Sequence, residues 1–259
     1  MLIDTHCHID AYPQPAHALA AAQEAGVRTL AVSTSLISFA RSRILARHYP
    51  DVLLGLGLHP RRAASGYDQW QEWLQMLETA AVVGEVGLDF RTGKEDNWAA
   101  QARTLAEIAD ASQGSNRLFL VHSHYAEAEA YDIIRSRDLK HVIWHDYRPE
   151  GPKSLLYRMV MAGHYIAVGP DAITSGTVRT RLKALPREQI LTETNGPWGR
   201  AGAAERVRPL REVLAALADA WRCVPEEAEA QVERNLNRLL TAAGLGASQT
   251  MVDHATSAV

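Results

Sequence analysis

Two histidines near the start of the chain, His6 and His8, close a short apolar run. Side chains on a β-strand alternate between its two faces, so residues two positions apart point the same way. The two imidazoles could therefore bind one cation, because neutral histidine is a common ligand of divalent metals. The pair predicts a metal site, and two ordinary polar histidines are the alternative.

Further candidate ligands follow later apolar runs. Glu85 lies in a glycine-rich segment, where its carboxylate could bridge two cations, and a surface glutamate at a turn is the alternative. His122 and His145 each follow a run of apolar residues. Imidazole and carboxylate together suit Zn, Mn or similar divalent ions, whereas Mg is favoured where oxygen ligands dominate. We therefore expect one or two divalent metal ions as the cofactor.

Residues that could contact an anionic substrate follow the same runs. His59 could contact a phosphate or order water, and capping of the turn before Pro60 is the alternative. Trp198 and Tyr147 could stack on an unpaired base, although packing is the usual role of a single aromatic residue. Five arginines follow expected strand ends within a few residues and could meet phosphates, although most exposed arginines are only solvated: Arg61, Arg62, Arg91, Arg148 and Arg200.

The composition is that of an ordinary folded protein. Hydrophobic residues make up 47% of the 259 residues and charged residues 22%. The net charge of −3 indicates no global basic field, so an anionic substrate would need local positive groups. Cys7 and Cys223 lie far apart, which argues against a disulfide scaffold and favours a reducing compartment. No signal peptide or membrane helix is predicted, so we expect a cytoplasmic protein without a membrane partner.

Apolar runs that alternate with amphipathic segments predict the fold. Continuous apolar character is typical of parallel strands that are covered on both faces. Strand followed by helix eight times favours an α/β fold of the (β/α)8 TIM type with extra C-terminal helices, and an open doubly wound sheet is the alternative. The expected strands are 2–8, 29–34, 52–59, 81–90, 118–124, 141–145, 165–168 and 190–194, and expected helices include 16–25, 68–80, 97–111, 206–222 and 225–243.

The domain organisation is predicted to be simple. We expect one catalytic barrel domain over residues 1–245 and a flexible tail over 246–259, which is small, polar and without periodicity. In a barrel the carboxyl ends of the strands meet at one face. The polar residues that fall at the ends of expected strands should therefore converge there: His6, His8, His59, Glu85, His122, His145 and Asn195.

These motifs together resemble the TatD family of metal-dependent hydrolases, in the amidohydrolase-like barrel group. The resemblance covers roughly residues 1 to 240, and the motifs run in the order of the family. The matching pieces are Asp4-Thr5-His6-Cys7-His8, Gly57-Leu58-His59-Pro60, Gly84-Glu85-Val86-Gly87-Leu88-Asp89, the strand-end His122 and His145, and Thr192-Glu193-Thr194-Asn195-Gly196-Pro197.

The resemblance implies a metal-dependent phosphodiesterase, commonly a DNase of the 3′-to-5′ exonuclease kind, with single-stranded DNA as the favoured substrate. It implies that His6, His8, Glu85 and Asn195 hold one metal, and that Glu85, His122 and His145 hold the second. The expected catalytic residues are Glu85, Asn195, Glu193 and His59, and Glu193 shares the face of Asn195 by the period of two in extended backbone.

The sequence departs from the pattern of the family at three places. Asn195 stands where the family has an aspartate, and a neutral amide can coordinate a cation but cannot accept a proton from the attacking water. We therefore expect impaired activity, whether Asn195 arose by natural divergence or by deliberate substitution. His124 stands where the family often has arginine, and Asp146-Tyr147-Arg148 replaces an aromatic-Ser-Gly stretch. Both changes bear on substrate preference.

Two other functions are consistent with these residues. One is hydrolysis of a small amide or ester by the same type of barrel, although Glu85 in place of a bridging lysine favours phosphoester chemistry. The other is a non-catalytic subunit that binds nucleic acid or a partner protein, for which Asn195 is the argument. The opening segment 6–13 also resembles TatD-like members of bacterial antiphage gene clusters, which implies protein partners in a defence complex. The sequence predicts no oligomeric state.

Overall fold

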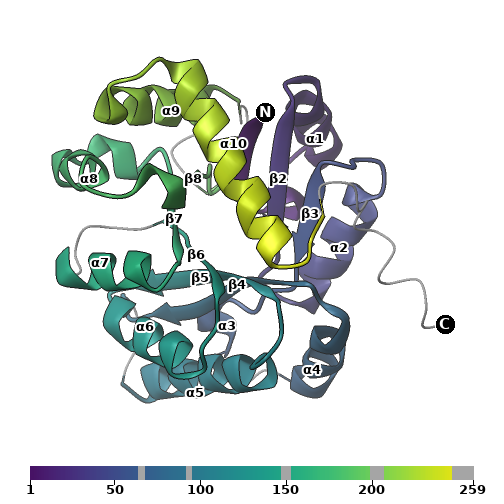
Figure 1. Ribbon diagram of the computed structural model, residues 1–259. Helices are drawn as coiled ribbons and strands as arrows, with labels where there is room; N and C mark the ends of the chain where they lie inside the picture. The colour runs from purple at the N-terminus through teal and green to yellow at the C-terminus, as the bar shows by residue number, and fades with distance from the viewer. Residues whose placement is uncertain (64–67, 92–94, 147–152, 199–206, 247–259) are drawn as a thin grey trace.

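Parallel strands form the inner wall of a barrel in the computed structural model, and helices lie outside them (Figure 1). The structure describes residues 1–63, 68–91, 95–146, 153–198 and 207–246. The predicted (β/α)8 TIM-type fold is confirmed within these residues. The eight described strands are β1 (Leu2–Cys7), β2 (Val27–Val32), β3 (Val52–Gly55), β4 (Val82–Asp89), β5 (Leu118–His124), β6 (His141–Trp144), β7 (Tyr165–Val168) and β8 (Ile190–Thr192).

The expected helices match observed ones within two residues at each end, because the apolar periodicity and the glycine stops are strong signals. Short 3-10 turns, η1 (Ile9–Ala11), η2 (Ala172–Thr174) and η3 (Arg187–Gln189), complete the element order. The helices are α1 (Pro15–Glu24), α2 (Leu36–Ala46), α3 (Pro60–Ala63), α4 (Trp70–Thr79), α5 (Glu95–Ala111), α6 (Glu127–Ser136), α7 (Lys153–Met161), α8 (Gly176–Leu182), α9 (Val207–Trp221) and α10 (Pro225–Ala242).

Several strands are shorter at their carboxyl ends than the sequence indicates. The runs expected to reach His59, His145 and Thr194 leave the ladder earlier, at Gly55, Trp144 and Thr192. The apolar pattern continues past the last ladder hydrogen bond, so hydrophobicity alone overestimates strand length. The polar residues beyond these ends consequently stand on the rim of the barrel.

The strands form two hydrogen-bonded ladders, β1-β2-β3 and β4-β5-β6-β7-β8, which join at two narrow seams. At the first seam, the Leu56 amide donates to the Val82 carbonyl at 3.0 Å, and the Gly84 amide donates to the Leu56 carbonyl at 2.9 Å. Leu56 therefore connects β3 to β4, the strand that carries Glu85.

The second seam joins β8 to β1. The His8 amide donates to the Gly196 carbonyl at 2.7 Å, and the Asn195 amide donates to the His6 carbonyl at 3.0 Å. Below these bonds, the fully buried Asp4 accepts from the Thr194 amide at 2.9 Å and from the Thr194 hydroxyl at 2.8 Å. These side-chain hydrogen bonds of Asp4 thus take the place of backbone bonds between β8 and β1. They lie next to the carboxyl end of β1, where His6 and His8 are found.

Replacing Thr194 by valine is expected to lower the free energy of unfolding by about 3 kcal/mol, because two buried hydrogen bonds are lost. The hydroxyl donates to Asp4 and accepts from the Gly196 amide at 3.0 Å, and valine can do neither. Urea unfolding followed by circular dichroism measures the change. Thr194→Ser, which keeps the hydroxyl, should be much less destabilised. Equal stabilities of the serine and valine variants would contradict this role of the hydroxyl.

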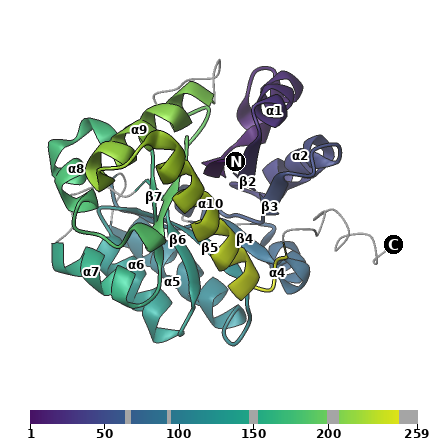
Figure 2. The same ribbon diagram turned by 45° about the horizontal axis from the view of Figure 1, so that its top comes forward.

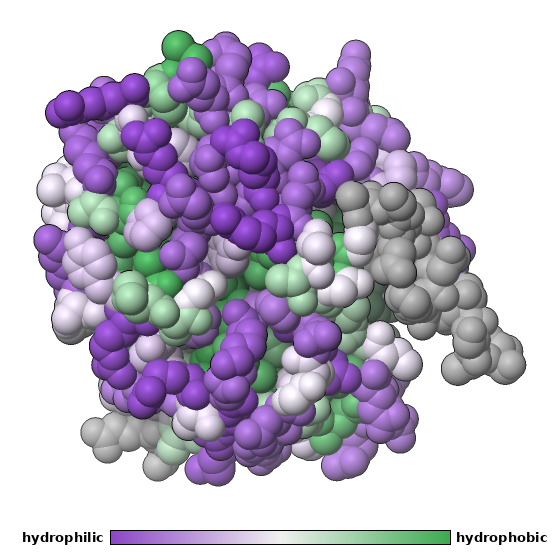
Figure 3. Space-filling model, in the orientation of Figure 1, coloured by the Kyte–Doolittle hydropathy of each residue, from purple (hydrophilic) through white to green (hydrophobic). Residues whose placement is uncertain are grey.

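Helix α10 crosses the amino-terminal ends of the strands, as both ribbon views show (Figures 1 and 2). The Asn235 amide group donates to the carbonyls of Arg187 and Ile190 at 2.7 and 2.8 Å, and the Arg238 guanidinium donates to the Tyr165 hydroxyl at 3.2 Å. The face seen in this orientation is predominantly hydrophilic (Figure 3). The amino-terminal end of the barrel is therefore covered, and the predicted site residues belong to the opposite end.

His164 is a buried polar residue that directly precedes β7, at the amino-terminal end of the barrel. It is 2% exposed, and its Nδ1 accepts a hydrogen bond from Trp144 Nε1 at 3.1 Å. Burial lowers the pKa of the His164 imidazole to about 4, with a smaller contribution from Lys140 and an opposing one from the Leu139 backbone. The neutral ring is therefore part of the packed core.

This depressed pKa predicts a pH-dependent stability. Between pH 6.5 and about 4 the unfolded chain binds a proton at His164 and the folded chain does not, so stability present above pH 6.5 is lost as the pH falls. The loss attributable to this group is at most about 3 kcal/mol. Urea unfolding across this range should show a steeper decline for the wild type than for His164→Asn, which keeps a hydrogen-bond acceptor. Parallel curves would assign the decline to other groups.

The domain boundary at residue 245 stays a prediction, and residues 247–259 of the expected tail lie outside the described residues. Tyr147, Arg148 and Arg200 also lie outside them. No helix in the described ranges combines the length and the apolar character needed to cross a membrane.

Candidate metal centre

The carboxylate of Glu85 lies at the centre of a cluster of imidazoles at the carboxyl ends of the strands. Glu85 is 3% exposed, so its charge is almost completely removed from solvent. In the described part of the chain, five histidines approach it. The distances to Oε1 are 3.2 Å from His122 Nδ1, 3.5 Å from His145 Nε2, 3.7 Å from His59 Nε2 and 3.8 Å from His6 Nε2, and His8 Nε2 lies 3.7 Å from Oε2.

Close contact between β4 and β5 positions Glu85 beside His122. The register pairs Gly87 with His122, and an irregularity between Val83 and Glu85 shifts the strand by one residue. Gly87 has a φ of +144°, and a Cβ at this position would lie 1.9 Å from the His122 carbonyl oxygen. Only glycine fits, so the backbone of β4 can approach the strand that supplies the imidazole.

Two sets of potential ligands share Glu85. One consists of His6, His8 and Glu85, and the other of Glu85, His122 and His145, with the ligand atoms of each set within 4.8 Å of one another. Within the sets, His6 Nε2 lies 3.3 Å from His8 Nε2, and His122 Nδ1 lies 2.9 Å from His145 Nε2. Nitrogen atoms that converge in this way around one carboxylate can hold a pair of bridged cations.

The electrostatics of the cluster favour cation binding. Burial lowers the pKa of both His6 and His8, which keeps their imidazoles in the neutral form that binds metals. Burial alone would raise the pKa of the Glu85 carboxyl, but His59, His8 and the hydrogen bonds of His122 and His145 together hold it well below its usual range. Glu85 is therefore ionised and can supply negative charge to a cation.

His145 differs from the other imidazoles. Burial lowers its pKa, but the nearby carboxylates of Glu193 and Glu85 outweigh this effect and raise the pKa to about 10. A cation at this ring would therefore replace a proton, as is usual when metals bind ionisable ligands.

Several buried polar atoms in the cluster test whether a metal fits. Buried polar groups are normally hydrogen-bonded, so a concentration of unsatisfied ones indicates a missing partner. The donor set of imidazole nitrogen and carboxylate oxygen suits Zn, Mn or a similar divalent ion. The atoms without a hydrogen-bond partner among the described residues include His6 Nδ1, Glu85 Oε2, His122 Nε2, His145 Nδ1 and Glu193 Oε2. The residues present thus fit a metal centre.

His59 follows β3 and has two distinct contacts. Its Nδ1 accepts a hydrogen bond from the Arg61 amide at 3.2 Å, while its Nε2 faces Glu85. Burial lowers the pKa of His59 to about 4, so the ring is neutral. Because Nδ1 is an acceptor, the single proton belongs on Nε2. His59 is thereby prepared to donate a hydrogen bond at the centre rather than to bind a cation.

Glu193 and Asn195 follow β8 and occupy different places. Glu193 is fully buried, its Oε1 accepts from the Asp146 amide at 2.6 Å, and its Oε2 lies 3.8 Å from His145 Nδ1. It therefore contacts His145 on the side of the ring away from Glu85, and it also forms a potential ligand group with His6 and His145. Asn195 is beside the histidine pair through its backbone bond to His6.

Two acidic residues at the rim, Asp89 and Asp146, have basic partners that the sequence did not predict. Asp89, at the end of β4, is fully buried and binds the guanidinium groups of Arg61 and Arg91. His124 Nε2 lies 3.0 Å from Asp146 Oδ2, so the residue at the position of a common family arginine is paired with an acid. Asp89 is part of the recognised glycine-rich motif, and Arg91 follows it by two residues, but Arg61 comes from a separate segment that no local pattern indicates.

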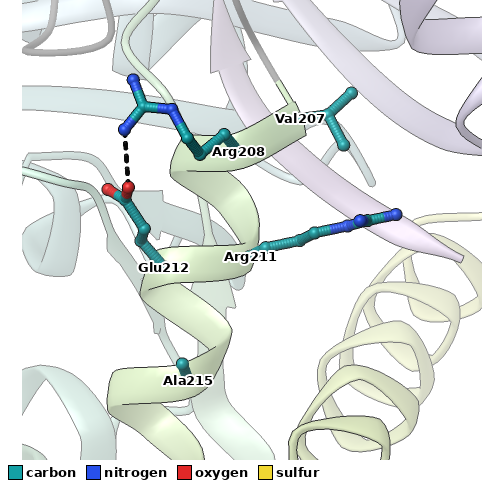
Figure 4. Close-up of a pocket in the computed structure, with 5 residues that line it drawn as sticks. All are labelled: Val207, Arg208, Arg211, Glu212 and Ala215. Atoms are coloured by element: carbon teal, nitrogen blue, oxygen red, sulfur yellow. Dashed lines mark hydrogen bonds and ion pairs between the residues drawn. The ribbon is translucent and has the colours of Figure 1, made fainter.

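A surface hollow at the start of α9 lies outside this cluster (Figure 4). Arg208 forms an ion pair of 2.7 Å with Glu212, and Arg211 points away from that pair. None of the residues that line the hollow contacts Glu85: Val207, Arg208, Arg211, Glu212 and Ala215. The hollow is therefore separate from the cluster at the barrel rim.

A TIM-type barrel with histidines and acids at the carboxyl ends of its strands is an arrangement that suits a metal-dependent hydrolase of the amidohydrolase type. The fold and the donor set of this chain are consistent with this class. More specifically, the chain belongs to the TatD related DNase family, whose sequence profile matches residues 3–241.

Three relatives illustrate the similarity. Human deoxyribonuclease TATDN3 is 27% identical over 215 residues, which are 76% of this chain and 78% of the relative. The 3′-5′ ssDNA/RNA exonuclease TatD of Erwinia tasmaniensis is 26% identical over 187 residues, 68% of this chain and 71% of the relative. The crystal structure of the TatD homologue YjjV from Escherichia coli K12 has a TM-score of 0.80 at 27% identity and covers 92% of this chain and 97% of that one.

Proposed function

We propose that the chain is a divalent-metal-dependent phosphodiesterase that degrades single-stranded DNA in the 3′-to-5′ direction. The observation that carries the proposal is the buried Glu85 carboxylate shared by two sets of imidazoles. Membership of a DNase family supports a nucleic-acid substrate, and the name of the Erwinia relative supports the polarity and the single-stranded form.

The bound cations would stabilise negative charge on the phosphate and make a water nucleophile available near neutral pH. The proposed ligands are His6, His8, Glu85 and Asn195 for one cation and Glu85, His122 and His145 for the other.

The remaining residues orient groups or move protons. Glu193 would hold the His145 ring through its Nδ1, because the two groups lie 3.8 Å apart. His59 would donate its Nε2 proton to a phosphate oxygen or to water. Asn195 can coordinate a cation through its amide oxygen but cannot accept the proton of the attacking water, so activity should be low.

An exposed aromatic residue supports the preference for single strands. Trp198 is 68% exposed, and its ring centroid lies 6.3 Å from that of His8. A base that is unpaired can stack on such a ring, whereas a paired base in a duplex is already stacked on its neighbours. We also propose a cytoplasmic location, and protein partners in a defence complex on the basis of the opening segment alone.

The proposal is tested by incubating the purified protein with labelled single-stranded DNA and Mg, Mn or Zn, followed by a chelator. Cleavage from the 3′ end that requires a metal and stops with the chelator supports the proposal, and elemental analysis identifies the bound ion. Cleavage that the chelator does not affect would exclude a metal nuclease. Metal-dependent hydrolysis of a small amide or ester, but not of DNA, would favour the alternative substrate class. DNA binding without cleavage, even after Asn195→Asp, would favour a binding subunit.

A further inference from the structure

We infer that Arg61 and Arg91 together form a binding site for one phosphate of the substrate strand, beside the metal centre. This inference rests on the proposed function, because it assigns a neighbouring phosphate of the same strand to a defined place on the rim. The two arginines come from different segments, α3 and the residues after β4, and the same buried carboxylate holds them.

Asp89 fixes the position of both guanidinium groups. Arg61 Nε lies 2.9 Å and an Arg91 terminal nitrogen 3.2 Å from Asp89 Oδ2, and the Arg91 amide donates to Oδ1 at 3.1 Å. The Asp89 carboxylate is fully buried, whereas the two arginine side chains are 48% and 42% exposed. Two positive groups thus meet one negative group, and one positive charge is left over at the surface.

Each guanidinium keeps donors for a ligand. Arginine has five N–H donors in a planar fork that matches the oxygens of a phosphate. Asp89 accepts one guanidinium bond from each arginine, and neither side chain has a further hydrogen bond within the described ranges. The net charge of the chain is −3, so a local positive pair of this kind is what an anionic substrate requires.

The arginine pair lies next to the residues around Glu85. Asp89 Oδ2 is 3.7 Å from His122 Nε2, and the Arg61 amide bonds to His59. The pair belongs to the β3–β4 side of the rim, while Trp198 follows β8 beside His8. A strand with its scissile phosphate at Glu85 therefore has a neighbouring phosphate within reach of the arginines.

A third cation is the alternative occupant, because His59, Asp89 and His122 form a potential ligand group. Two observations oppose it. Both guanidinium groups bind the same Asp89 oxygen that faces His122, so a cation there would meet two positive charges. In addition, the Nδ1 of His59 already accepts a hydrogen bond, which leaves its Nε2 protonated. An anion beside the exposed arginine donors avoids both conflicts.

The test measures binding rather than cleavage. Fluorescence anisotropy of a short thymidine strand with phosphorothioate linkages, which resist hydrolysis and keep their charge, gives the affinity at several salt concentrations for the protein as purified. The variants are Arg61→Gln, Arg91→Gln and both together. Arg158→Gln is the matched control, because Arg158 is 52% exposed and pairs with Asp132 on the outer helices.

If the two arginines share one phosphate, each single variant should weaken binding about fivefold or more. Each should also reduce the slope of log affinity against log salt by about 0.7, and the double variant should reduce this slope by no more than about 0.7. Arg61→Lys should restore most of the slope, because the slope reports charge. A neutral methylphosphonate at one position of the strand should weaken wild-type binding but not binding by the double variant.

Three results would overturn the inference. A double variant with a slope reduced by about 1.4 would indicate two separate phosphates. Variants that bind like the wild type and like Arg158→Gln would remove the arginines from the binding surface while leaving the proposed nuclease function intact. A wild-type protein that binds no single strand at all would exclude both the phosphate site and the proposed substrate, and the cleavage assay would then fail as well.

Discussion

Glu85→Gln is expected to lose bound metal and to reduce metal-dependent DNA cleavage by a factor on the order of 10³. Glutamine has nearly the same shape, but its neutral amide cannot bridge two cations as a carboxylate can. In the wild type, imidazole nitrogens lie 3.2 to 3.8 Å from the charged carboxylate of Glu85. The glutamine amide would place an N–H donor among these nitrogens. Elemental analysis of the purified variant and a cleavage time course measure the two losses.

A glutamate at the other end of the barrel supplies the control. Glu188 lies in η3, which precedes β8, and its side chain is exposed, so Glu188→Gln removes the same charge without touching the cluster. This control should keep both metal and activity. If Glu85→Gln retains its full metal content and cleaves DNA normally, Glu85 is not part of the metal centre. The arrangement of two ligand sets that share Glu85 would then also be wrong.

The fold and the cluster around Glu85 could be predicted from the sequence because both depend on patterns that are visible in short segments. The runs that end in His122 and His145 are apolar enough to be identified as buried strands, and parallel strands of a barrel bring their carboxyl ends together regardless of the loops between them. Glu85 was predictable for the same reason. No knowledge of side-chain contacts is needed to place these residues on one rim.

Contacts between segments could not be predicted in this way. Asp89 binds Arg61, which follows β3, across the narrow β3–β4 seam, and this contact is not visible in the local sequence. The two roles considered for His59 prove to involve different ring nitrogens, since Nδ1 bonds within the turn and Nε2 faces Glu85.

The alternation of side chains along a strand ends where the strand ends, and this affects the position predicted for Glu193. The period of two predicts that Glu193 and Asn195 share one face, but β8 ends at Thr192, and Asn195 has a φ of +52°. The regular alternation of an extended strand does not continue through a left-handed residue. Glu193 accordingly contacts Asp146 and His145, while the backbone of Asn195 binds β1.

Asn195→Asp is expected to raise the turnover number by a factor on the order of 10², because it restores a group that can accept the proton of the attacking water. The exchange should preserve the fold, since asparagine and aspartate both tolerate the left-handed backbone that residue 195 adopts. The turnover number and the metal concentration needed for half-maximal activity are measured together. An unchanged turnover number would remove residue 195 from the chemical step.

The dependence on metal concentration separates two explanations for such a gain. Aspartate adds a negative charge and should bind a cation more tightly than the amide does, so part of the gain could reflect a better-filled site. That part disappears at saturating metal. The gain that comes from proton acceptance persists there, because the amide cannot accept a proton however completely the site is filled. A ratio of turnover numbers that falls to one at saturating metal would assign residue 195 to metal binding alone.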